Sequence, residues 1–363
     1  MEAIPDKVLD KALAEQALSA NEILQLLTAE GAAATALFQA ARTARSKYFA
    51  NKIALYGFIY FSTHCRNDCA FCLYRRSNRG YGRYRKSGAE IVAAAKALAA
   101  SGVHCLDLTM GEDPYFLDRG SEGLDELTAI VGEVKGQTDL PLMISPGVAP
   151  EQALKALHEA GADWYACYQE THNRRLFAAL RLGQNYDRRW RLKQYARSIG
   201  MLVEEGLLVG VGDEAADALQ SLQAMGELAA AQLRAMTFAP QANTPMAGPP
   251  AADCRRELNL IAVMRLVFPW TLIPASLDCQ GVDGLKARLS AGANCVTSLI
   301  PPQSGLQGVS RATADIDEGR RDVASVLPIL AEMGLRAATV GEYRDWLTHL
   351  RGRQAAAKCK EAA

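Results

Sequence analysis

The sequence has no apolar run that approaches the roughly 20 residues needed to cross a bilayer. The stretch from Met1 to Asn51 lacks the charged-then-apolar pattern of a secretion signal. Basic and acidic residues balance at 40 each, and no polybasic block occurs, so a nucleic-acid footprint is not indicated. We therefore expect a cytoplasmic protein that binds neither nucleic acid nor membrane. Its length allows one large barrel or two ordinary domains.

Cysteine occurs mostly as scattered single residues, which in the cytoplasm are reduced thiols rather than a disulfide framework. These single cysteines are Cys105, Cys167, Cys254, Cys279, Cys295 and Cys359. The exception is one loop, Cys65-Arg-Asn-Asp-Cys69-Ala-Phe-Cys72, directly behind an apolar run from Leu55 to Ser62. Spacings of three and two residues let three thiolates converge on one centre.

This loop suits an iron–sulfur cluster better than zinc. A structural zinc site takes four protein ligands, and His64 is too close to Cys65 in the chain to reach the same metal easily. Three thiolates suit a four-iron cluster with one iron left open. Phe71 gives the loop an apolar lid. A zinc site and three ordinary buried thiols are the alternatives.

Short apolar runs alternate with helical patterns from Leu55 onward, which predicts a parallel sheet with helical crossovers. Eight such strand-then-helix units predict an α/β fold, a closed (β/α)8 TIM barrel over residues 51–338, with a partial barrel as the alternative. The strands are expected at 55–63, 103–109, 140–145, 163–169, 202–209, 233–238, 271–275 and 294–300.

The segments outside the barrel are predicted to be helical. Residues 1–50 are rich in helix formers and form an N-terminal helical cap, in which Ser19 is an N-cap followed by Glu22. Residues 339–363 form a C-terminal helix and tail. In the barrel, functional residues gather at the C-terminal ends of the strands. That rule selects Asp107, Gly111 to Asp113, Ser145, Tyr168 to Glu170, Gly210 to Gly212 and Ser276 to Asp278.

The cysteine spacing and the adjacent Phe71 resemble the radical S-adenosylmethionine (SAM) superfamily. The resemblance implies a [4Fe–4S] cluster on Cys65, Cys69 and Cys72 whose open iron binds SAM. An external electron donor reduces the cluster, and SAM is then cleaved to a 5′-deoxyadenosyl radical. The superfamily also carries a Gly-Gly-Glu segment that contacts the SAM amino group. Here Met110 replaces its first glycine, ahead of Gly111 and Glu112.

Further residues at strand ends are candidates for holding SAM. A glycine such as Gly111 lets the backbone approach a bound group closely, and Glu112 could pair with an ammonium. Arg181 suits a carboxylate because its guanidinium makes paired, charge-assisted hydrogen bonds. Ser145 and Glu170 could bind the ammonium or the ribose.

Three charged residues are candidates for holding a substrate, because charge inside a barrel is costly unless it is paired. Asp107 lies on an apolar strand, Arg234 lies in strand six and Asp278 follows strand seven. Together they would complement a small zwitterion with an extra ammonium, such as lysine. The alternative is an internal salt bridge between Arg234 and either aspartate.

Longer segments resemble the methylornithine synthase family of pyrrolysine biosynthesis, between about residues 45 and 335. They are 55–63, 106–115, 143–147, 168–171, 180–183, 236–238, 272–278 and 294–302. The resemblance implies an isomerase, a mutase that converts L-lysine to (3R)-3-methyl-D-ornithine by hydrogen abstraction, fragmentation and recombination. It assigns Asp107, Arg234, Ser276 and Asp278 to the substrate, and Ser145, Tyr168, Glu170 and Arg181 to the cofactor.

Two other functions stay open at this point. One is another enzyme of the biotin synthase and maturase branch that acts on a related basic amino acid. Sulfur insertion in that branch needs a second barrel cluster, and strands three and five contain no cysteine. The other, from a different class, is a non-catalytic zinc or thiol-redox protein.

Overall fold

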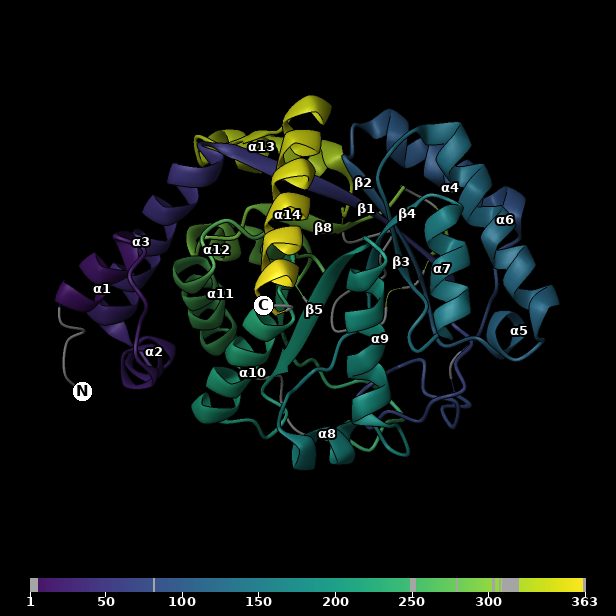
Figure 1. The fold of residues 1–363 in the computed structure, drawn as a ribbon, viewed down its shortest axis with the longest axis horizontal. Helices are drawn as coiled ribbons and strands as arrows, with labels where there is room; N and C mark the ends of the chain where they lie inside the picture. The colour runs from purple at the N-terminus through teal and green to yellow at the C-terminus, as the bar shows by residue number, and fades with distance from the viewer. Residues whose placement is uncertain are drawn as a thin grey trace.

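The computed structural model describes residues 6–361, with gaps at 81, 249–252, 279, 302–303, 307 and 309–319 (Figure 1). The side chains of residues 6 and 357–361 are also outside the description. The sequence also predicts the last barrel helix over residues 318–333, and its start at Glu318 lies outside the described residues. So do Cys279, Pro302 and the side chain of Cys359. The described cysteines are free thiols.

Within the described residues, eight parallel strands form one sheet in the order β6-β5-β4-β3-β2-β1-β8-β7. The strands are β1 (Lys52–Ser62), β2 (Cys105–Met110), β3 (Leu142–Ser145), β4 (Ala162–Ala166), β5 (Leu202–Val209), β6 (Gln232–Thr237), β7 (Pro274–Ser276) and β8 (Cys295–Leu299). Helices alternate with them and surround the sheet (Figure 1). The predicted (β/α)8 architecture is confirmed.

The barrel closes between β6 and β7, the two ends of this strand order, through a short contact. Leu272, just before β7, accepts from the Leu233 N–H at 2.9 Å and donates to the Ala231 carbonyl at 3.1 Å. The predicted strand at 271–275 is shortened at its start, and Pro274 has no N–H with which to extend a ladder. Closure is therefore real but rests on an isolated bridge rather than a full strand pair.

The helices follow the predicted alternation, with two short additions, α5 and η1, that the sequence patterns missed. The described barrel helices are α4 (Gly88–Ser101), α5 (Pro114–Leu117), α6 (Ser121–Thr138), α7 (Glu151–Glu159), α8 (Arg174–Leu180), α9 (Tyr186–Ser198), α10 (Ala215–Glu227), α11 (Arg255–Val267), the 3₁₀ turn η1 (Gly281–Gly284), α12 (Leu285–Ser290) and α13 (Val323–Glu332). Among the described residues no helix is both long and apolar enough to cross a membrane.

Three helices precede the barrel, and α2 and α3 pack on its α11 side (Figure 1). They are α1 (Asp6–Leu13), α2 (Ala20–Leu27) and α3 (Gly31–Phe49). The predicted cap of α2 is confirmed: Ser19 and Glu22 form a reciprocal capping box. After α13, the chain adds β9 (Arg336–Ala337), which pairs with the start of β1, and α14 (Val340–Glu361). The division at residues 50 and 338 stays a prediction.

Candidate active site

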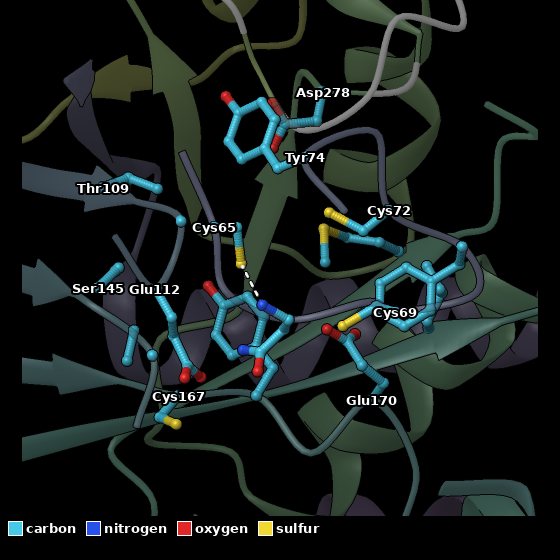
Figure 2. A pocket seen from close by; sticks show the side chains of 18 of the residues that line it. Cys65, Cys69, Cys72, Tyr74, Thr109, Glu112, Ser145, Cys167, Glu170 and Asp278 are labelled. Atoms are coloured by element: carbon cyan, nitrogen blue, oxygen red, sulfur yellow. Dashed lines mark hydrogen bonds between the residues drawn. The ribbon is translucent and has the colours of Figure 1, made fainter. Parts of the chain in front are cut away.

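The cysteine loop leaves the end of β1 and lies over the C-terminal mouth of the barrel. Cys65, Cys69 and Cys72 all line one cavity, and Figure 2 shows their side chains around it. Two backbone hydrogen bonds fix the loop, one to the segment after β2 and one to the C-terminal end of α8. The Arg66 N–H donates to the Glu112 carbonyl at 2.9 Å, and the Ala70 N–H donates to the Leu180 carbonyl at 2.8 Å.

Gly111 explains how this loop can lie so close to β2. A Cβ atom at that position would come within 2.3 Å of the His64 carbonyl oxygen and 2.9 Å of the Cys65 Cβ. The close approach predicted for Gly111 is therefore made to the protein's own cysteine loop. No side chain larger than hydrogen fits there without moving the loop.

The three thiols fit a cluster site by their chemistry. Burial raises the pKa of Cys65 to about 11, and burial together with the neighbouring thiols raises the pKa of Cys72 above its ordinary value. A bound metal must displace these protons, as thiolate coordination requires. Among the described residues no three His, Cys, Asp or Glu side chains are grouped to hold a single metal ion. Cys65, Cys69 and Cys72 line one shared cavity, where three thiolates could hold a [4Fe–4S] cluster with one iron left open.

Glu170 and Arg181 form a buried ion pair beside Cys69. The Arg181 guanidinium donates to Glu170 Oε1 at 2.6 Å and lies 5.6 Å from the Phe71 ring centre. Burial raises the pKa of Glu170 above its ordinary value, although Arg181 opposes the rise. Glu170 Oε2 and Arg181 Nε have no hydrogen-bond partner among the described residues. A zwitterionic cofactor such as SAM would fit these two open positions.

Glu112 occupies the opposite side of the cavity mouth (Figure 2). Its carboxylate accepts from Arg189 at 3.0 Å, from Arg66 at 3.2 Å and from the Val148 N–H at 2.9 Å. Burial would raise the pKa of this carboxyl, but the Arg189 charge and the hydrogen bonds hold it below its ordinary value. The ammonium contact predicted for Glu112 would therefore have to share the carboxylate with two guanidinium groups.

Asp107 stands deeper in the barrel, on β2, and is 1% exposed. The Ser145 hydroxyl donates to its Oδ1 at 2.7 Å, whereas Oδ2 has no hydrogen-bond partner among the described residues. Burial raises the pKa of Asp107 to about 7, and the negative charge of Glu204 adds to the rise. Ser145, predicted on the cofactor side, thus contacts a predicted substrate residue.

Arg234 pairs with Glu204 of β5, not with either aspartate that the sequence suggested. Its Nε donates to Glu204 Oε1 at 2.8 Å, and its second terminal nitrogen (Nη2) has no partner among the described residues. The Tyr168 hydroxyl donates to the other oxygen of Glu204 at 2.7 Å. Tyr168, also predicted on the cofactor side, therefore braces the Arg234 pair.

Asp278 is held at the end of β7 by hydroxyls and one guanidinium. Tyr60 donates to it at 2.7 Å, Ser298 at 2.8 Å and Arg321 at 3.1 Å. Ser276 donates to Asp278 at 3.1 Å. Ser276 is not among the residues that line the described cavity, so its predicted substrate role would act through Asp278.

Apart from Ser276, the residues assigned to the cluster, the cofactor and the substrate all line this one cavity. They are Cys65, Cys69, Phe71, Cys72, Asp107, Gly111, Glu112, Ser145, Tyr168, Glu170, Arg181, Arg234 and Asp278. The sequence analysis missed Glu204, Arg189 and Arg321, which pair with residues of that set. Two successive acids inside the apolar run of β5 were a usable signal for Glu204, because buried charge needs a partner. Residues 210–212 are not among the residues lining the described cavity.

Comparison with known proteins agrees with this geometry. Residues 59–224 match the Radical SAM superfamily. The chain is 42% identical to 3-methylornithine synthase of Methanosarcina acetivorans, over 86% of this chain and 87% of that protein. It is 41% identical to the Methanosarcina barkeri enzyme of the same name, over 93% and 95%. A further relative, the [FeFe] hydrogenase maturase subunit HydE of Thermotoga maritima, is 28% identical over 86% and 88%.

The solved structures give the same result. The crystal structure of methylornithine synthase (PylB) matches with a TM-score of 0.88 and 40% identity, covering 93% of this chain and 99% of that one. The maturase HydG of Carboxydothermus hydrogenoformans shares the fold alone, with a TM-score of 0.78 at 19% identity. Identity above 40% over most of both chains decides the assignment: the chain belongs to the 3-methylornithine synthase family of radical SAM enzymes.

Proposed function

We propose that this enzyme converts L-lysine to (3R)-3-methyl-D-ornithine, the first step of pyrrolysine biosynthesis. A [4Fe–4S] cluster on Cys65, Cys69 and Cys72, together with SAM, serves as the cofactor. Family membership supports the reaction type. The observation that carries the substrate assignment is the balance of charge in the cavity beneath the cysteines.

All but one of the charged side chains that line the described cavity have an ion-pair partner. The pairs are Glu112 with Arg189, Glu170 with Arg181, Arg234 with Glu204 and Asp278 with Arg321. Asp107 is the exception among the described residues. One uncompensated buried carboxyl favours a ligand with one more ammonium than carboxylate groups. Lysine has that charge.

Lysine's three charged groups have complementary positions on the walls. The open Oδ2 of Asp107 suits an ammonium, and the open terminal nitrogen of Arg234 suits the carboxylate. Asp278 can accept the second ammonium. Each charge-assisted hydrogen bond contributes about 1.5–3 kcal/mol. A ligand held at three points keeps its carbon chain in one orientation under the cysteines.

The cofactor end of the cavity has the groups that SAM requires. Arg181 would bind the carboxylate of SAM, and Glu170 would accept from its ammonium or ribose. When bound, the cluster and SAM supply a 5′-deoxyadenosyl radical that removes a hydrogen atom from the substrate. Phe58, Tyr60 and Phe238 line the same space, and their aromatic rings would exclude water from a bound substrate.

The walls also serve the carbon rearrangement itself. Lysine must break into two fragments that rejoin at a different carbon, and neither fragment can be allowed to leave. Anchors on different strands hold both ends, so recombination gains the effective-molarity advantage of an intramolecular step. We further propose that an external electron donor reduces the cluster and that the reaction takes place in the cytoplasm, where free thiols such as those described are stable.

Anaerobic reconstitution tests the proposal. The protein should take up iron and labile sulfide, and with dithionite and SAM it should form 5′-deoxyadenosine in amounts that rise with added L-lysine. Chromatography with mass detection should find a product of the same mass as lysine. Cys72→Ala is the control and should form no 5′-deoxyadenosine. Zinc without labile sulfide would exclude the enzyme, and 5′-deoxyadenosine formation that ignores lysine would exclude the substrate.

A further inference from the structure

Gln184 lies in the loop between α8 and α9, directly after Gly183, whose φ is +72°. This turn brings the Gln184 side chain to Cys69, and its amide nitrogen lies 3.0 Å from the Cys69 sulfur. The Cys65 sulfur, in contrast, accepts from the backbone N–H of Asn67 at 3.4 Å. Arg181 Nη1 also lies 3.7 Å from the Cys69 sulfur, so Gln184 makes the shorter of two side-chain contacts. The Gln184 contact can be removed by mutation, whereas the backbone contact to Cys65 cannot.

The orientation of the Gln184 amide is fixed by its other neighbours. Arg189 lies 2.7 Å and Arg181 3.5 Å from the amide oxygen. A guanidinium group only donates hydrogen bonds, so the atom that faces both arginines must be the oxygen. The NH₂ group then points at the sulfur of Cys69.

Arg189 is itself held firmly in place. It is 2% exposed, and it donates to Glu112 at 3.0 Å and to the Cys167 sulfur at 2.9 Å. A cation at the amide oxygen polarises the amide and makes its N–H a stronger donor. Gln184 is not among the residues that line the described cavity, so it acts on the sulfur and not on SAM or lysine.

We propose that Gln184 sets the reduction potential of the cluster through an N–H···S hydrogen bond to the Cys69 thiolate. The inference rests on the cluster assignment in the proposed function. Reduction makes the cluster more negative, and a donor to a ligand sulfur stabilises the reduced form more than the oxidised form. The bond therefore raises the potential, and Gln184 is a positioning and tuning residue rather than a catalytic one.

The test is a redox titration of the cluster-loaded enzyme, followed by electron paramagnetic resonance, without SAM or lysine. Gln184→Met keeps the length of the side chain and removes the donor, so the midpoint potential should shift to a lower value. Gln184→Glu removes the donor and adds a negative charge held by two arginines, so its shift should be larger in the same direction. Arg188→Met, an exposed neighbour on α9, should match the wild type.

Equal potentials in the wild type and Gln184→Met would overturn the inference. A Gln184→Met protein that holds less iron and sulfide than the wild type would overturn it too, because the amide would then be needed for assembly and not for tuning. The two proposals fail separately. A wild type without iron and sulfide defeats the proposed function, whereas a normal cluster with unshifted variants defeats only the role of Gln184.

Discussion

Asp107→Asn is expected to abolish tight lysine binding without destabilising the protein. Asp107 is buried, the Ser145 hydroxyl donates to its Oδ1, and its pKa is raised to about 7 by burial and by Glu204. The amide of the variant keeps the Ser145 hydrogen bond at its oxygen. The substitution removes the negative charge that, in the proposed function, binds an ammonium group of lysine.

The sign of the stability change follows from the raised pKa. An unfolded aspartate releases its proton near pH 4, whereas the folded protein keeps this one until about pH 7. Between these values the folded state binds more protons, so the free energy of unfolding falls as pH rises. The fall is on the order of 4 kcal/mol by pH 8. A new unpaired amide N–H costs about 1–3 kcal/mol, so the variant should be the more stable protein at pH 8.

Lysine binding should weaken in the variant, although its folded state is more stable at pH 8. Loss of one charge-assisted hydrogen bond of about 1.5–3 kcal/mol raises the lysine KM by roughly 10- to 150-fold. The assay is lysine-dependent 5′-deoxyadenosine formation at several lysine concentrations. Thermal melts of the anaerobic, cluster-loaded protein between pH 4 and pH 8 measure stability. The variant's melting temperature should lack the fall that the wild type shows over this range.

Asp278→Asn is the matched control. Burial alone would raise the pKa of Asp278, but Arg321 and the Tyr60 hydroxyl hold it below its ordinary value. This carboxylate therefore stabilises the protein at neutral pH, and its removal leaves a buried guanidinium unpaired. Asp278→Asn should melt at a lower temperature than the wild type at pH 8. If Asp107→Asn melts equally low and its lysine KM is unchanged, then the carboxyl is a structural group and the charge argument is wrong.

Three further predictions test other parts of the site. Arg234→Met leaves Glu204 buried without its cation and should lower the free energy of unfolding in denaturant by about 3–5 kcal/mol. The double variant Arg234→Met, Glu204→Met should recover most of that stability but not lysine-dependent turnover. Gly111→Ala places a Cβ against the His64 carbonyl, so reconstituted protein should hold less iron per chain. Arg181→Met should raise the Kd for SAM about 10- to 150-fold, as measured by equilibrium dialysis with the cluster-loaded enzyme.

The sequence predicted the barrel well because each of its signals was local. Apolar runs of strand length alternated with helical patterns, and Ser19 with Glu22 marked a helix start that the structure reproduces. The cysteine loop was equally visible, since its three thiols are neighbours in the chain. The weak point was β7, where Pro274 shortens the strand and leaves closure to Leu272. No local sequence pattern predicts how many residues of one strand pair with the neighbouring strand.

The partners of the charged site residues were harder to predict, because they come from distant strands and loops. The alternative to a substrate role for Arg234 was a salt bridge with Asp107 or Asp278, but its partner is Glu204, 30 residues earlier on the adjacent strand. The rule that selects strand ends also missed Glu204, because it is the third residue of β5. The family resemblance assigned Tyr168 and Ser145 to the cofactor, and only the fold shows that they hydrogen-bond to Glu204 and Asp107.

Helix α9 shows why composition can conceal such residues. Its charged sequence is typical of a solvated surface, yet Arg189 and Lys193 are buried, four residues apart on the face that meets the barrel. Lys193 pairs with Glu205 of β5, whose side chain alternates with that of Glu204 and so points outward to the helix. Glu205 also accepts from the Gln169 N–H at 2.8 Å, immediately before Glu170. The two adjacent acids of β5 therefore support opposite ends of the site, one through Arg234 and the other through the backbone that carries Glu170.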